Sequence, residues 1–163
     1  MINTSIRRAL VLSSLVLGAT TLFSAKAMAD TVTLGGTVAS TLTLTTTTLG
    51  AAGALNLTTP TPRIVQVADL AISTNNEQGY TLTATSGNLL NLGGTSIAYQ
   101  VTTTADTLPA AAGNFAVANH TFASSAANAA NTNGRDLYIM YTPAALQDPG
   151  IYGGTITLSV IDN

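Results

Sequence analysis

The stretch DTVTLGGTVASTLTLTTTT, residues 30–48, alternates apolar and hydroxyl side chains in the manner of a β-strand. The other face of such a strand would be mostly threonine, a β-branched residue that favours strands. A strand near a chain end exposes unpaired backbone groups, and here it also exposes an apolar face. We therefore expect this segment to pair with another strand. Its apolar face would carry Val32, Leu34, Gly36, Val38, Ser40, Leu42 and Leu44.

The residues before this stretch have the features of a secretory signal peptide. Two arginines precede an apolar run at 9–23, and AKAMA (25–29) ends with the small residues that a signal peptidase recognises. The alternative is a retained membrane anchor, but the run is shorter than the roughly 20 residues that span a bilayer. We predict a signal peptide at residues 1–29, export through the periplasm, and no retained transmembrane segment.

The remaining 134 residues, 30–163, have few charges. Arg63 and Arg135 stand against seven acids, which gives a side-chain charge of −5. Nucleic acid is bound through basic side chains that replace its counterions, so we expect no nucleic-acid partner. Export permits disulfides, yet the chain contains no cysteine. Burial and backbone pairing must therefore stabilise a single domain of this size.

The rest of the sequence predicts an all-β sandwich of about seven strands and no helix. Short alternating runs recur at intervals of roughly 8–12 residues, separated by turns rich in glycine, asparagine and proline. Residues 105–134, rich in alanine and asparagine, indicate a long surface excursion. The expected strands are 63–74, 80–86, 88–92, 96–104, 135–143 and 151–163, with short strands at about 55–58 and 115–122.

The inventory of reactive side chains argues against an enzyme. The chain has one histidine, His120, which we interpret as an exposed loop residue, and it has no Cys/His cluster for zinc. We expect no catalytic, cofactor or metal site. The five tyrosines are better explained by packing than by a sugar-binding platform. Four carboxylates lie near predicted turns or strand ends and are expected to be solvated: Asp69, Asp106, Asp136 and Asp148.

Two segments carry a resemblance to a known family. DPGIYGGTITLSVIDN (148–163) and ISTNNEQGYTLTATSGN (72–88) resemble segments of pilin subunits of the chaperone–usher pathway, in the archaic, spore-coat-U-like branch. Gly150 is the fourteenth residue from the C-terminus, as in many of those pilins. The chain departs from the family at Asp162, where many members carry an aromatic residue, and in lacking a disulfide near the first strand.

The resemblance implies an immunoglobulin-like sandwich that lacks a strand and is completed by the N-terminal extension of another subunit. Residues 30–40 would be the donor strand and residues 41–163 the pilin domain. Other copies of the chain, a periplasmic chaperone and an outer-membrane usher would be its partners in building an extracellular fimbria. The residues implied are Val32, Leu34, Gly36 and Val38 in the donor strand, and Ile156, Leu158 and Val160 in the acceptor groove.

A second hypothesis belongs to a different class of protein. A secreted, monomeric β-sandwich could be a carbohydrate-binding or adhesin module, with its site on the 105–134 segment or on a tyrosine face. Its first strand would then lie in its own sheet. The sequence leaves open whether the opening strand is exchanged between chains or folded back within one, because both arrangements bury the same face.

Overall fold

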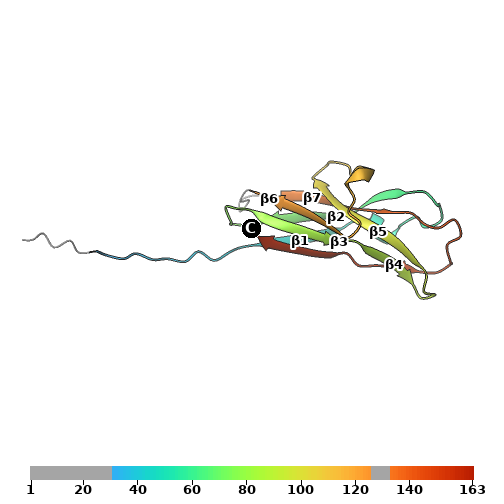
Figure 1. Ribbon diagram of the computed structural model, residues 1–163, viewed down its shortest axis with the longest axis horizontal. Helices are drawn as coiled ribbons and strands as arrows, with labels where there is room; N and C mark the ends of the chain where they lie inside the picture. Colours follow the sequence, from blue (N-terminus) through green and yellow to red (C-terminus); the bar gives the residue numbers. More distant parts are fainter. Residues whose placement is uncertain (1–30, 126–132) are drawn as a thin grey trace, which may run out of the picture. The chain divides into compact units, whose positions relative to one another are not determined.

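A computed structural model of the chain describes residues 31–125 and 133–163. The chain divides into two units, Met1–Thr37 and Val38–Asn163, and the second unit holds the strands (Figure 1). The predicted signal peptide at 1–29 lies outside the described residues, as do Asp30 and residues 126–132 of the long excursion. Within the described ranges, no helix is long and apolar enough to cross a membrane.

The all-β prediction is confirmed, with two antiparallel sheets enclosing the core. The described residues form nine strands, more than the seven or so expected, and the run expected at 151–163 is divided between β8 and β9, which belong to different sheets. The larger sheet has the order β1 (Thr43–Thr48), β2 (Arg63–Ser73), β7 (Asn133–Tyr141), β5 (Ser96–Ala105), β4 (Gly87–Asn91) and β8 (Tyr152–Gly153). The smaller sheet has the order β6 (Asn119–Ser124), β3 (Tyr80–Thr85) and β9 (Thr157–Asp162).

The buried apolar side chains lie on alternate positions of the strands, as the sequence pattern predicted. On β3, Tyr80, Leu82 and Ala84 are fully buried while the threonines between them are more exposed. On β7, the buried apolar positions also alternate. A bulge between Gln66 and Ala68 interrupts the pairing of β2 with β7, and both Val67 and Ala68 are buried there. The bulge therefore lets two successive residues of β2 contribute to the core.

The prediction of a short strand at about 55–58 is wrong. A 3₁₀-helix, η1 (Gly50–Gly53), follows β1, and no strand forms between it and β2. The side chain of Asn56 accepts hydrogen bonds from the backbone N–H and the hydroxyl of Thr58, both at 3.1 Å. Such a local side-chain turn competes with sheet pairing, although Leu55 still packs against the core.

The strand expected around 115–122 lies slightly later, at β6. A second 3₁₀-helix, η2 (Ala112–Asn114), precedes it, and Ala116 forms an isolated bridge to Val101. Ser86 donates its hydroxyl hydrogen to the carbonyl of Ala116 at 2.8 Å. These bonds hold the start of the segment against β5, so regular pairing with β3 begins only at Asn119.

Candidate functional site

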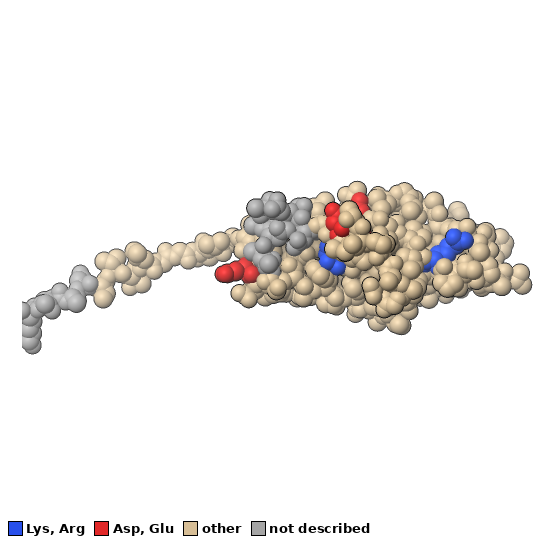
Figure 2. Space-filling view, turned by 90° about the horizontal axis from the view of Figure 1, so that it is seen from above, with Lys and Arg blue, Asp and Glu red and all other residues tan. Residues whose placement is uncertain are grey.

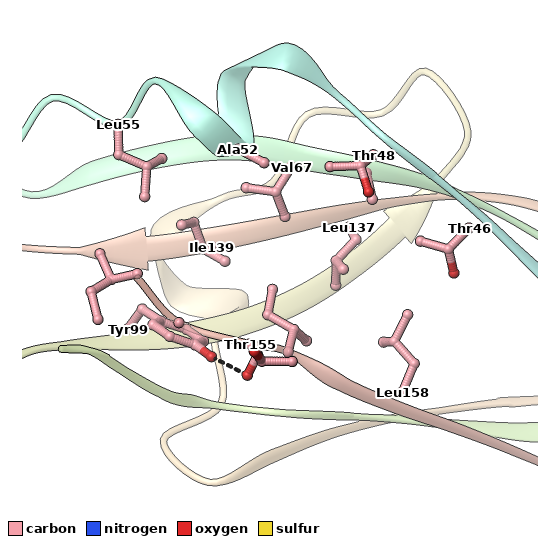
Figure 3. A pocket seen from close by; sticks show the side chains of 14 residues that line it. Thr46, Thr48, Ala52, Leu55, Val67, Tyr99, Leu137, Ile139, Thr155 and Leu158 are labelled. Carbon is pink, nitrogen blue, oxygen red and sulfur yellow. Dashed lines mark hydrogen bonds between the residues drawn. The ribbon is translucent and has the colours of Figure 1, made fainter. Parts of the chain in front are cut away.

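An apolar groove of about 270 Å³ lies between the two sheets where β1 and β9 form neighbouring edges (Figure 3). In the described chain, β1 pairs with β2 alone and β9 pairs with β3 alone. Each strand therefore has one edge of its backbone without a strand partner. The residues lining the groove are Thr46, Thr48, Ala52, Leu55, Val67, Ala68, Leu89, Tyr99, Leu137, Ile139, Gly154, Thr155, Ile156 and Leu158.

One wall of the groove comes from β1 and the segment after it. Thr46 and Thr48 occupy the same face of the strand as Leu44, which packs against the core. Beyond the strand, Ala52 of η1 and Leu55 continue this wall (Figure 3). The inward hydroxyls alternate with threonines that point outward, so the wall is formed by the same two-residue period that predicted the strand.

The opposite wall comes from β9 and the residues before it. Ile156 and Leu158 line the groove, whereas the residues between and after them, Thr157 and Ser159, are exposed. The hydroxyl of Tyr99 donates a hydrogen bond of 2.7 Å to the carbonyl of Thr155, which holds this segment against β5 (Figure 3). Burial raises the pKa of the Tyr99 hydroxyl, so the group remains a neutral donor.

The floor of the groove consists of core residues of β2 and β7. Val67, Leu137 and Ile139 lie between the two walls (Figure 3). Alternation identifies Leu137 and Ile139 as inward-facing, whereas Val67 faces inward because of the bulge in β2. Alternation also cannot distinguish a side chain beneath an open groove from one beneath a closed seam. Among the fourteen described lining residues none is charged, so an apolar strand would suit this groove best.

The predicted acceptor residues are only partly in the groove lining. Ile156 and Leu158 line it, while Val160 is partly buried against the core without being among the lining residues. The predicted donor residues Val32, Leu34 and Val38 have exposed fractions of 83%, 89% and 86%. A Cβ built on Gly36 would meet nothing within 4 Å. The pairing of these two sets stays a prediction.

Three aspartates that are far apart in the sequence are close enough to interact: Asp69, Asp106 and Asp136. Asp136 is 4% exposed in the middle of β7, so the expectation of a solvated turn carboxylate is wrong for it. Burial raises its pKa, and so do the charges of Asp106 and Asp69, while a hydrogen bond from the backbone of Thr107 opposes the shift. Asp69 faces Asp136 across the β2–β7 pair, a contact between strands distant in sequence.

His120 also differs from the expectation, because it lies on β6 and is half-buried. Its Nε2 is 3.1 Å from the hydroxyl of Thr103, which also accepts a hydrogen bond of 3.1 Å from Arg135 Nε. The Arg135 guanidinium stacks over the Phe122 ring at 3.4 Å. Burial, and then the charge of Arg135, lower the pKa of His120. The histidine therefore packs as a neutral ring at the sheet interface.

Among the described residues, no group of three or more His, Cys, Asp or Glu side chains could hold a metal ion. Tyr80, Tyr99 and Tyr141 are buried, which confirms packing as their role. Few acids and bases are visible on the face shown in Figure 2. The groove is thus the most distinctive feature of the domain.

No family model matches the chain, and no curated protein shows significant similarity to it.

Proposed function

We propose that this protein is a structural subunit of an extracellular fimbria, a chaperone–usher-like pilin that polymerises by donor-strand exchange. The observation that carries the proposal is the open apolar groove between two unpaired sheet edges, β1 and β9, in the described domain. The same chain carries a strand-like apolar segment at residues 32–38, outside any strand of the structure. An apolar strand would suit the groove, and the extension has a suitable pattern of apolar side chains.

The chemistry of this association is β-strand addition. Backbone N–H and C=O groups of an incoming segment pair with a free strand edge, and pockets for alternate side chains select its register. Val32, Leu34 and Val38 would fill the groove, and Gly36 would occupy a shallow part of it. Each aliphatic side chain that becomes fully buried contributes roughly 1.5–3 kcal/mol. Pairing along a whole strand edge adds to this and makes withdrawal slow.

The proposed contact produces a filament. The donor segment and the groove are different surfaces of the same chain, so each subunit can accept one neighbour while donating to another. Such a head-to-tail contact generates an open polymer unless its rotation closes a ring. A periplasmic chaperone would cover the groove before assembly, and an outer-membrane usher would export the growing fibre to the cell surface. Export and these two partners are part of the proposal.

Deleting residues 30–38 tests the proposal and leaves residues 39–163 intact. The full mature chain should form ladders that resist SDS without heating, and the deleted chain should form none. A matched pair separates groove filling from general damage: Leu34→Asp places a charge on the groove-facing side and should abolish the ladder, whereas Thr33→Asp on the other face should retain it. A stable monomer without ladders, whose melting temperature falls on deleting residues 30–38 or on Leu34→Asp, would support the monomeric binding module instead, because its first strand lies in its own sheet.

A further inference from the structure

The chain is tied to the domain at three points immediately before β1. The Asn75 amide donates from Nδ2 to the carbonyl of Ala39 at 2.8 Å, and its Oδ1 accepts from the backbone N–H of Thr41 at 2.9 Å. Between these two bonds, the hydroxyl of Ser40 donates to Oδ2 of Asp162. We call Asn75 and Asp162 together the exit clamp. Neither residue is used by the groove.

The Asn75 amide holds the backbone around Ser40 extended. In a strand, the carbonyl of one residue and the N–H of the residue two positions later point to the same edge. One primary amide bonds both groups and so replaces a neighbouring strand. The register supports this, because β1 pairs Thr43 with Ser73, and continuing it by two residues places Thr41 opposite Asn75. The side chain thereby extends the ladder beyond the last residue of β2.

Asp162 connects this path to the other sheet. It is the last residue of β9, and its Oδ1 accepts a hydrogen bond of 2.6 Å from the hydroxyl of Thr74. Thr74 is fully buried, so the carboxylate is held from one side by a fixed group. The hydrogen bonds from Ser40 and Thr74 lower the pKa of Asp162, which keeps it an ionised acceptor near neutral pH.

The position of the clamp matters because of where a fold-back would have to turn. For the extension to enter the groove of its own domain alongside β1, it must form a hairpin with β1. Residues that face each other in a hairpin are equidistant in sequence from its turn. A hairpin that places Leu34 opposite Thr46, or Val32 opposite Thr48, therefore has its turn centred on residue 40. A turn at Gly35–Gly36 would pair Leu34 with Thr37, short of the groove. Ser40 is the residue that the clamp holds extended.

We propose that Asn75 and Asp162 prevent the N-terminal segment from folding back into its own groove and so direct it to the groove of a second copy. This inference rests on the proposed function. In this inference, the exit clamp determines whether the N-terminal segment is exchanged between chains or folds back within its own chain. Asp162, at the position where the resembling pilins often carry an aromatic residue, gains a role as an anchor for the hydroxyl of Ser40.

The absence of cysteine makes a direct test possible. Leu34→Cys with Thr46→Cys, introduced into the mature chain, reports a fold-back as a disulfide within one chain, seen as a monomer without free thiol on a non-reducing gel. Refolding from denaturant at several protein concentrations separates this closure, which is independent of concentration, from polymerisation. The clamp is removed with Asn75→Ala, and Asp162→Asn serves as a milder second variant that keeps the shape of the side chain.

The matched control is Asn76→Ala. Asn76 lies in the same turn and makes comparable bonds, to the carbonyl of Asn163 and from the N–H of Gln78, but none to residues 39–41. We expect the parent and Asn76→Ala to form ladders, and the clamp variants to raise the ratio of closed monomer to polymer roughly tenfold, as expected for losing one or two net hydrogen bonds.

The outcomes separate the inference from the proposed function. Ladders in the parent together with unchanged ladders and no closed monomer in both clamp variants would overturn the clamp and leave the pilin proposal standing. A closed monomer in the parent itself would also overturn the clamp. Neither ladder nor closed monomer in the parent would contradict the proposed function, and the clamp would fall with it.

Discussion

Gly154 lies in the wall of the groove, where its backbone packs closely against β4. A Cβ built on it would be 2.8 Å from the carbonyl oxygen of Asn88 and 3.1 Å from Cδ2 of Leu89. The backbone oxygen cannot move without disturbing the β4–β5 pairing. The glycine is therefore required by close approach.

Gly154→Ala should lower the free energy of unfolding by about 1–3 kcal/mol, the usual cost of inserting a methyl group into a packed site. Gly153→Ala is the matched control, because a Cβ there meets nothing within 4 Å. Urea unfolding followed by tyrosine fluorescence measures both variants. Equal stability of the two variants would show that the segment before β9 can move away from β4.

His120 should make the stability of the domain depend on pH. Burial and the charge of Arg135 lower its pKa below the ordinary value of 6.5. In the range below about pH 6.5 the unfolded chain binds a proton that the folded chain does not, so the free energy of unfolding falls as the pH falls. The decrease is complete once the pH has dropped below the pKa of the folded state.

His120→Gln removes this titration while keeping a polar group near Thr103. We expect its free energy of unfolding to fall less than that of the parent between pH 7 and pH 5, because any contribution from the raised pKa of Asp136 is common to both chains. Urea unfolding at three pH values measures the slope. Identical slopes in the two chains would place the pH dependence on another group.

At the scale of the elements, alternation predicted most strands and failed where side chains bond locally. The runs at 63–74, 80–86 and 135–143 match β2, β3 and β7 within two residues because a half-buried strand requires that period. Residues 55–58 also alternate apolar and polar side chains, but Asn56 accepts a hydrogen bond from the backbone N–H of Thr58, and this segment forms no strand. A local competitor of this kind leaves little trace in hydrophobic periodicity.

Contacts between strands that are distant in the sequence could not be predicted from it, for a different reason. The approach of Asp69 to Asp136, and of His120 to Arg135, depends on the strand order β2–β7–β5 and on the stacking of two sheets. Alternation determines which face a residue occupies but not which strand lies beside it. Asp136 occupies a buried position in its strand, and neither its neighbours in sequence nor the turn signals reveal this.

At the scale of the whole molecule, the groove depends on which strands form the edges of the two sheets. The two walls come from residues 46–55 and 154–158, which the chain brings together only when the fold is complete. The all-β class followed from spacing and composition, whereas the idea of an unfilled groove came from a family resemblance. In the described residues, β1 and β9 each have one strand neighbour.

An unfilled groove should accept a strand supplied in solution. A synthetic peptide of residues 31–40, added to the chain that lacks residues 30–38, should raise its melting temperature, because a ligand that binds only the folded state stabilises it. At a concentration of 100 times Kd this amounts to about 2.7 kcal/mol. The same peptide with Leu34→Asp is the control, since it would place a charge in the apolar groove. If the truncated chain refolds poorly alone, recovery of folded protein that requires the parent peptide gives the same information. An equal effect of both peptides, or of neither, would show that this groove does not select the apolar face of the extension, and the filament would then need another joint.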